Sequence, residues 1–426
     1  MTSKAAKPHP LRRILNALGP GLITGASDDD PSGIATYSQA GAQFGFSICW
    51  TMLFTYPLMA AIQEISARIG RTTGRGIAGN IRRCYPAWLL YLMVGLLAIA
   101  NTINIMADLS AMGEAGSFLV GGPPFLYTLV LAAICALLQI FVSYDRYAAV
   151  LRWLTLSLFS YFAAMLTVAV PWGDVARGLL VPTLSTDVAF WTTVVAVFGT
   201  TISPYLFFWQ ASQEAEDLRT DPDRKSFVRS PRQFLPETGR IRLDTYVGMA
   251  FSNLVALAMI VTTAATLHAN GVTDIQTSAQ AAKALEPVAG RFASAVFAFG
   301  ILGTGMLAVP VLAGSAAYAL GETLIWPVGL SRLPSRAVGF YATIALATMF
   351  GASLNVVSVS PVKALFISAV INGVVSVPVM VVMMLIARNP KVMGKYPVTG
   401  TLGHIGWAAT VAMALASTGM LLAVFL

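Results

Sequence analysis

Long apolar runs, interrupted by glycine, proline and clusters of charge, dominate the pattern of this sequence. A helix needs about 20 predominantly apolar residues to cross a bilayer, and runs of that order recur along the whole chain. The pattern therefore predicts an all-α integral membrane protein with eleven transmembrane helices. The expected spans are 14–41, 44–69, 86–119, 125–142, 148–171, 189–212, 244–268, 291–320, 336–356, 360–387 and 403–425.

Two of these runs contain a point where the helix is expected to break. In the first run, Pro31 follows a stretch of acids, and proline removes a backbone donor. In the sixth run, Pro204 lies between small polar residues and aromatic ones. Broken helices at corresponding places in two halves indicate an inverted-repeat transporter with its site at the midplane. We therefore expect one transporter domain over the whole chain, with repeats at 14–171 and 189–387 and an extra helix at 403–425. The alternative for Pro204 is a hinge that contacts no ligand.

Composition supports a membrane protein and excludes a soluble enzyme. Apolar residues make up 56% of the chain and charged residues only 11%, against about 25% charged residues in an average soluble domain. No GxxxxGK[ST] motif is present, so ATP is not expected to drive this chain directly.

The basic residues predict the orientation, because cytoplasmic loops accumulate Lys and Arg. With the N-terminus inside, all but four of the 27 basic residues fall on the cytoplasmic side, and the four are Arg177, Lys283, Arg291 and Lys363. An odd helix count then places the C-terminus outside. The protein is expected in the cell (inner) membrane. The net charge of +8 is thus a topology signal and does not indicate nucleic acid binding. The polar segment 213–243 is expected to be a solvated cytoplasmic connection, or alternatively a partner-binding loop. No obligate protein partner is evident.

Acidic residues inside the expected spans are the strongest candidates for function. Asp28, Asp29 and Asp30 lie in the first span, and Asp108 and Glu114 in the third. Each such acid costs about 2.5 to 3.5 kcal/mol at the middle of a membrane helix, so these groups must face water, protein or a cation. The alternative for the triplet is that it caps a half-helix, since Asp is a favoured N-cap.

Five segments resemble the Nramp family of divalent metal transporters, which have the LeuT-type 5+5 inverted-repeat fold. The opening GPGLITGAS…DPSGIATYSQAGAQFGF is similar to the family's first helix, with its GPG and DPGN motifs. QEISARIGRTTGRGIAG resembles its second helix and ADLS its third. GTTISPYLFFWQAS resembles its sixth helix and FAFGILGTGMLAVPVLAG its eighth. The resemblance implies a LeuT-type fold with broken helices 1 and 6.

The resemblance also implies which positions bind the transported ion. The family binds a transition metal through the DPGN Asp and Asn and a sixth-helix Met. Here the Asp is kept as Asp30, the Asn stands as Gly33 and the Met as Ser203. A tenth-helix Gln of the family stands as Ala369, with Asn372 one turn later. The resulting candidates for the metal site are Asp28, Asp29, Asp30, Gly33, Thr200 and Ser203.

The loss of the thioether changes the expected substrate. A sulfur ligand favours soft or borderline metals, whereas carboxylates, hydroxyls and carbonyls suit Mg²⁺, Mn²⁺ or Ca²⁺. We therefore expect a secondary transporter that imports a hard divalent cation, Mg²⁺ or Mn²⁺, as its substrate and needs no cofactor. The alternatives are a LeuT-type carrier of a small organic or amino-acid-like cation and a non-transporting sensor.

Proton coupling is expected to be weak or absent. Two sixth-helix histidines of the family stand as Tyr205 and Gln210, and neither side chain titrates near neutral pH. The third-helix Asp of the family's proton path is kept as Asp108, but its partner Glu stands as Ala111. Glu114, one turn further on, is the possible substitute. We assign Asp108, Glu114, Tyr205, Gln210 and Asn372 to a proton path or gate.

Overall fold

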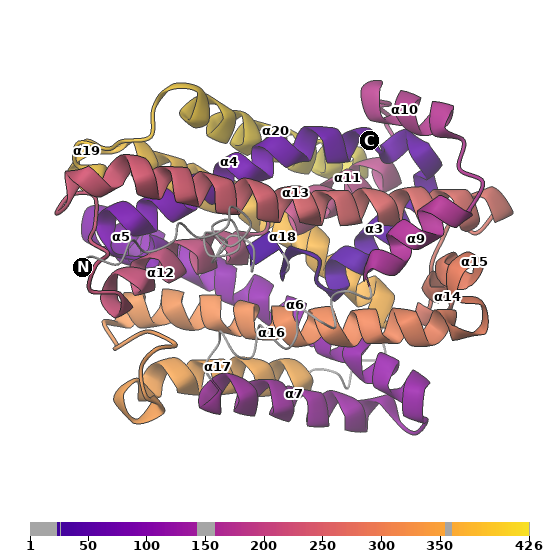
Figure 1. Ribbon diagram of the computed structural model, residues 1–426, viewed down its shortest axis with the longest axis horizontal. Helices are drawn as coiled ribbons and strands as arrows, with labels where there is room; N and C mark the ends of the chain where they lie inside the picture. The colour runs from indigo at the N-terminus through magenta and orange to yellow at the C-terminus, as the bar shows by residue number, and fades with distance from the viewer. Residues whose placement is uncertain (1–23, 26, 143–157, 354–359, 426) are drawn as a thin grey trace, which may run out of the picture.

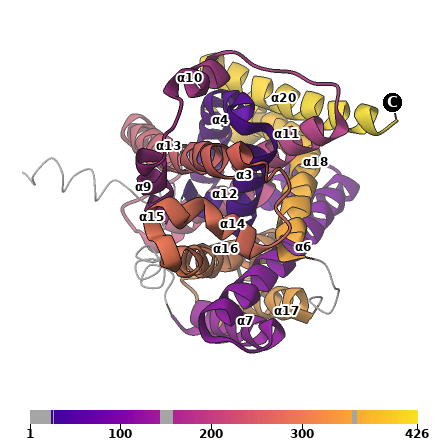
Figure 2. The ribbon, with the colours of Figure 1, turned by 90° about the vertical axis from the view of Figure 1, so that its right-hand side faces the viewer.

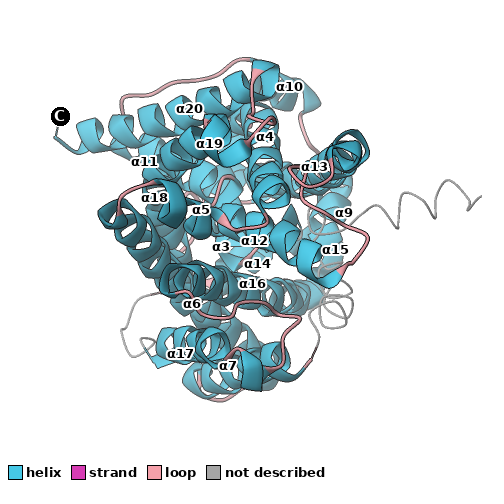
Figure 3. Cartoon of the chain, turned by 90° about the vertical axis from the view of Figure 1, so that its left-hand side faces the viewer, coloured by secondary structure: helices cyan, strands magenta, loops and turns pink. Residues whose placement is uncertain are grey.

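Long helices lie side by side along the longest dimension of the molecule (Figure 1). The structure is a computed structural model that describes residues 24–25, 27–142, 158–353 and 360–425, and in these ranges it contains helices and loops and no strand (Figure 3). The predicted all-α class is thus confirmed. The longer helices are α3 (Pro31–Phe44), α4 (Trp50–Thr73), α6 (Ala87–Val120), α7 (Pro124–Phe141), α11 (Val188–Thr201), α12 (Pro204–Thr220), α13 (Phe234–Thr266), α16 (Ala293–Leu324), α17 (Val338–Ser353), α18 (Pro361–Arg388) and α20 (Gly400–Phe425).

Short helices occupy the two ends of the bundle. In Figure 1, α5 and α19 lie at the left end, and α10, α14 and α15 lie at the right end. These short helices were not predicted, because they carry too few apolar residues to stand out as spans. The short elements are α5 (Ile77–Cys84), α9 (Phe159–Thr167), α10 (Trp172–Leu180), α14 (Ser278–Ala282), α15 (Glu286–Ala289), α19 (Pro390–Met393) and the 3₁₀ turns η1 (Gly45–Ile48), η3 (Pro231–Gln233), η4 (His268–Asn270), η5 (Lys283–Leu285), η6 (Gly290–Phe292) and η7 (Pro334–Arg336).

Proline sets the start of several long helices. Pro31, Pro124, Pro204 and Pro361 are the first residues of α3, α7, α12 and α18. At this position the missing N–H costs nothing and the fixed φ angle already suits the helix. The sequence therefore predicts these starts to within a residue or two wherever the proline follows a polar or small residue.

Among the described residues, seven helical stretches are long and apolar enough to cross a membrane. The pair Pro31–Ile48 and Trp50–Thr73, bent by 110°, makes an eighth. The expected span 148–171 lies largely outside the described residues, as does the start of 14–41, and α17 is a shorter apolar helix. The count of eleven helices and the division into two repeats remain predictions.

The middle of the bundle is formed by α3 and α12, with longer helices around them (Figure 2). Helix α3 packs on α13, α18 and α11, and α12 packs on α4 and α16. Helices α7 and α17 form one edge of the bundle, and α20 lies on the opposite side (Figure 2). The two helices that the sequence singled out as broken are thus enclosed by the others.

The polar connection expected at 213–243 is shorter than predicted. Helix α12 continues to Thr220, and α13 begins at Phe234. The reason is a buried ion pair, in which Arg240 donates to the two carboxylate oxygens of Glu214 at 2.8 and 2.7 Å. The two charges neutralise each other. Helices α12 and α13 therefore extend into a segment whose composition alone indicates a solvated loop.

Candidate metal site

The two helix breaks lie against each other in the middle of the molecule. The first helical segment ends at Asp28, residues Asp29 and Asp30 form the break, and α3 begins at Pro31. In the second break, α11 ends at Thr201 before α12 begins at Pro204. Across this junction, the hydroxyl of Tyr205 donates to the carbonyl of Ser27 at 3.0 Å and to Asp30 Oδ2 at 3.3 Å. Both predicted breaks are therefore confirmed, and they meet.

Gly33 lies where these two breaks pack against each other. A Cβ atom on this glycine would lie 3.3 Å from the carbonyl oxygen of Asp28, from Thr200 Cγ2 and from Tyr37 Cε2. These contacts are tighter than ordinary van der Waals contact, so a larger side chain at this position displaces its neighbours. Gly33 can contribute only its backbone to an ion site.

Asp30 caps α3 and also faces the centre of the site. Its Oδ1 accepts hydrogen bonds from the backbone N–H of Gly33 at 2.7 Å and from Ser32 Oγ at 2.6 Å. Its Oδ2 faces Tyr205 and accepts a bond from Asn104 Nδ2 at 3.2 Å. The capping role that was the alternative for the triplet thus holds for Asp30, whose second oxygen faces Asn104 and Tyr205 on the other side.

Asp28 and Asp29 turn toward a different helix. The hydroxyl of Ser252 on α13 lies 2.6 Å from Asp28 Oδ2 and 3.2 Å from Asp29 Oδ1. The other oxygen of each carboxylate has no hydrogen-bond partner among the described residues. No group of three or more His, Cys, Asp or Glu side chains in those same ranges is arranged to hold a metal ion. Convergence of all three acids on one ion therefore remains a prediction.

Helices α6 and α18 form the wall of the candidate site opposite α13. Asp108 on α6 is fully buried, and neither of its oxygens has a hydrogen-bond partner within the described ranges. Asn372 on α18 is 1% exposed, and both of its amide atoms are likewise unpartnered there. Thr200 Oγ1, at the end of α11, is a further buried oxygen without a partner in the described part of the chain. The wall thus offers oxygen and amide groups.

The remaining predicted residues divide between the site and its surroundings. Ser203 lies at the second break, where its hydroxyl lies 2.6 Å from the carbonyl of Gly199 and 2.8 Å from that of Thr200. Gln210 Oε1 accepts a bond from Thr24 at 2.6 Å and so ties α12 to the segment before the first break. Glu114 accepts a bond from Ser278 at 2.6 Å, on the short helix α14, and is not brought to the breaks.

Three polar residues of the site were missed from the sequence. Asn104, Ser252 and Ser368 are buried and contact the acids directly or through one another. Asn104 lies four residues before Asp108 and therefore on the same face of α6, a spacing that was available in the sequence. The two serines gave no signal, since serine is common in membrane helices and can bond to its own backbone.

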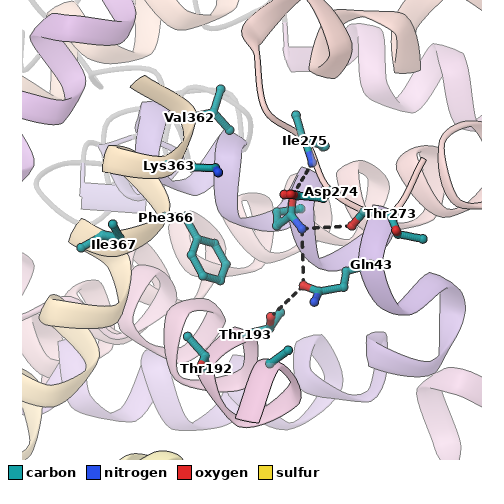
Figure 4. Close-up of a pocket in the computed structure, with 12 residues that line it drawn as sticks. Gln43, Thr192, Thr193, Thr273, Asp274, Ile275, Val362, Lys363, Phe366 and Ile367 are labelled. Carbon is teal, nitrogen blue, oxygen red and sulfur yellow. Dashed lines mark hydrogen bonds between the residues drawn. The ribbon is translucent and has the colours of Figure 1, made fainter. Parts of the chain in front are cut away.

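A cavity of about 500 Å³ lies further along α3, α11 and α18, on one side of the breaks (Figure 4). Gln39, Gln43, Thr192 and Thr193 give it a neutral polar lining, with Asp274 and Lys363 as its charged side chains. Gln39 follows the start of α3 by about two turns, or roughly 12 Å at 1.5 Å per residue. The cavity is therefore separated from Asp30 by the length of two helical turns.

Comparison with known proteins agrees with this geometry. The family model for natural resistance-associated macrophage protein-like proteins matches residues 21–423. The chain is 26% identical over 403 residues to the divalent metal cation transporter MntH of Klebsiella pneumoniae, covering 92% of this chain and 91% of the relative. It is 28% identical over 307 residues to MntH of Erwinia tasmaniensis, covering 69% and 70%.

Solved structures show the same fold. A crystal structure of the manganese transporter of Eremococcus coleocola superposes with a TM-score of 0.72 at 16% identity, covering 98% of this chain and 88% of that one. MHP1, a nucleobase-cation-symport-1 family transporter, superposes with a TM-score of 0.52 at 13% identity, covering 95% and 92%. These matches confirm the LeuT-type fold, and with a family model that spans nearly the whole sequence the chain belongs to the Nramp family of membrane transporters.

Proposed function

We propose that this transporter carries a hard divalent cation, Mg²⁺ or Mn²⁺, through the site at the two helix breaks. The observation that carries the proposal is a group of buried carboxylates with no basic partner. Asp28, Asp29, Asp30 and Asp108 are each at most 2% exposed. None of them forms an ion pair with a basic side chain in the described ranges. Buried charges are normally paired or coordinate a metal, so this group calls for a cation.

The ligand chemistry favours a hard ion. Oxygen atoms face the site from Asp30, Tyr205 and Thr200, and the family's sulfur position is occupied by Ser203. Carboxylate, hydroxyl and amide oxygens suit Mg²⁺ and Mn²⁺, whereas a thioether favours softer metals. The names of the MntH relatives, divalent metal cation transporters, support a divalent substrate.

The spacing within the site favours an ion over an organic cation. Asn104 Nδ2 and the Tyr205 hydroxyl lie 3.2 and 3.3 Å from the same carboxylate oxygen of Asp30. Groups that already touch leave room for a single ion after small shifts, whereas an amino-acid-sized substrate requires the helices to separate. The carrier of a small organic cation is therefore the less favoured alternative.

The orientation of the protein in the membrane follows from the charge distribution. With most basic residues on one side, the N-terminus and the end of the bundle that carries α5 and α19 face the cytoplasm of a cell in whose inner membrane the protein lies. The cavity at Gln39 and Gln43 then opens on the outer side and serves as the entrance for a hydrated ion. The ion enters down its own gradient and the membrane potential, which supplies about 2.3 kcal/mol per charge per 100 mV.

Coupling to protons is weak or absent in this proposal. The chain has only three histidines, His9, His268 and His404, and none belongs to the breaks. Glu114, the candidate second station after Asp108, bonds to Ser278 instead. Glu114, the other carboxylate of α6, is therefore not placed at the breaks to take a proton from Asp108.

The test is uptake of Mg²⁺, Mn²⁺, Cd²⁺ and Ca²⁺ into proteoliposomes by the wild type and by Asp30→Asn. Asn caps a helix about as well as Asp, so this variant keeps the start of α3 and removes only the charge. Asp187→Asn is the matched control, since Asp187 caps α11 through Ala189 and is exposed. We expect uptake to be lost in Asp30→Asn and kept in Asp187→Asn. Normal uptake by Asp30→Asn removes the central claim.

A pH-sensitive dye inside the same vesicles tests the coupling. We expect little acidification during metal uptake by the wild type. Acidification in a fixed ratio to metal, lost in Asp108→Asn, contradicts the uncoupled mechanism while leaving the metal site intact.

A further inference from the structure

A buried amide joins the three helices that surround Asp30. Asn104 on α6 is fully buried, and its Nδ2 donates to Asp30 Oδ2 at 3.2 Å. On its other side, Asn104 Oδ1 lies 2.8 Å from the hydroxyl of Ser368 on α18. The carboxamide therefore bridges the break before α3 to α18 through α6.

The contact with Ser368 is compatible with either orientation of this amide. The Ser368 hydroxyl has one proton and two neighbouring acceptors, Asn104 Oδ1 at 2.8 Å and the carbonyl of Leu365 at 2.7 Å. When the hydroxyl donates to Leu365, its oxygen can accept a bond from an amide N–H. A half-turn of the Asn104 amide then keeps a hydrogen bond to Ser368, and such rotations about the terminal bond are roughly two-fold in energy.

The contact with Asp30 allows only one orientation at a time. Without a cation, the N–H₂ group must face the carboxylate, because two oxygens facing each other repel. With a divalent cation beside Asp30, the amide oxygen is the favourable neighbour and the N–H₂ group is repelled. The amide thus has a hydrogen-bond partner at Ser368 in both orientations. Whether its N–H₂ group or its oxygen faces Asp30 depends on the ion.

Asn104 also supplies an amide side chain, which position 33 lacks. The family's amide ligand stands here as Gly33, where a Cβ would meet three neighbours at 3.3 Å. An amide side chain at that place requires these neighbours to shift by a few tenths of an ångström, whereas the amide of Asn104 already reaches the Asp30 carboxylate from the opposite wall.

Resting on the proposed metal function, we propose that Asn104 is a ligand of the transported ion and supplies its amide oxygen after a half-turn from the orientation in which its N–H₂ group faces Asp30. Ser368 positions it. A neutral amide oxygen adds a hard ligand without further negative charge, which suits an ion that keeps part of its water shell.

The test is isothermal titration of purified protein with Mg²⁺, Mn²⁺ and Cd²⁺. Asn104→Leu keeps the approximate volume and removes the ligand, and Asn104→Asp keeps an oxygen there. We expect Asn104→Leu to weaken Mn²⁺ binding by about 10- to 100-fold, the range seen when groups that support metal ligands are removed. Asn104→Asp is expected to retain binding.

Asn104→Cys gives a readout that a purely structural role does not produce. A thiolate in place of the amide favours soft metals, so we expect Cd²⁺ affinity to rise relative to Mn²⁺ together with a sulfur-to-cadmium absorption band. The matched control is Asn101→Cys, one turn earlier on α6, whose amide donates to the carbonyl of Leu312 and to Ser315 and not to Asp30. It is expected to show neither change.

The outcomes separate the two proposals. If the wild type binds neither Mn²⁺ nor Mg²⁺, the metal function is wrong and this inference falls with it. If the wild type binds Mn²⁺, Asp30→Asn does not, and Asn104→Leu binds as the wild type does, only the role of Asn104 is refuted. The same holds if Asn104→Cys folds and gains no preference for Cd²⁺.

Discussion

Glu216 holds the end of α12 against the loop after α16, and its removal is expected to open that end of the bundle. Its carboxylate accepts hydrogen bonds from the backbone N–H of Ser331 at 2.6 Å and of Leu330 at 3.2 Å. The hydroxyl of Tyr318 on α16 donates to the same group. Glu216 is 6% exposed, so water cannot readily replace the carboxylate as the hydrogen-bond acceptor for these donors.

The size of the effect follows from these contacts. In Glu216→Gln one oxygen is replaced by an N–H₂ group that cannot accept, so at least one charge-assisted bond is lost. Hydrogen bonds to charged groups contribute about 1.5 to 3 kcal/mol each. A free-energy change of about 1.4 kcal/mol alters an equilibrium constant tenfold. The ratio of closed to open molecules should therefore fall roughly tenfold to hundredfold.

The assay is maleimide labelling of a cysteine placed between α12 and α16. Ala317 is fully buried on α16, one turn after Gly314, against which Trp209 of α12 packs. Ala317→Cys in a Cys84→Ser background should label slowly, because Cys49 and Cys135 are buried. Adding Glu216→Gln should raise the labelling rate about tenfold or more, if opening is fast relative to labelling.

A neighbouring acid is the matched control. Asp217 is the next residue of α12 and pairs with Arg224 at 2.6 Å, but both side chains are about 30% exposed. Exposed pairs contribute about 0 to 1 kcal/mol, so Asp217→Asn should leave labelling nearly unchanged. Equal labelling rates with and without Glu216→Gln, in protein that melts at the wild-type temperature, would refute the reasoning.

Three further outcomes follow from packing and charge. Gly199→Ala should lower the melting temperature strongly, because its Cβ would lie 2.1 Å from a backbone carbonyl of α18, whereas Gly95→Ala, with open space around it, should not. Arg240→Ala should cost about 3 to 5 kcal/mol in thermal or denaturant unfolding, since it leaves Glu214 buried without its partner, and the added change Glu214→Gln should restore part of the loss. Ser203→Met should strengthen Cd²⁺ binding relative to Mg²⁺ in calorimetry, because it returns a thioether to the second break. Unchanged selectivity in that variant means that position 203 does not face the ion.

The sequence by itself determined where the helices lie and where two of them break. The run expected at 86–119 is observed as Ala87–Val120, and that at 360–387 as Pro361–Arg388. These features are local, since the length of an apolar run and the position of a proline act on the residues beside them. The family resemblance, carried by contiguous motifs, was readable for the same reason.

Only the tertiary structure decided how the site is assembled. Three adjacent acids look alike in the sequence, yet Asp30 faces α6 while Asp28 and Asp29 face Ser252 on α13. Asn104 became a candidate ligand only when α6 brought its amide to the break before α3. These contacts join residues separated by 74 to 224 positions. Their side-chain directions depend on how helices pack around the breaks, a property that no single segment of the chain contains.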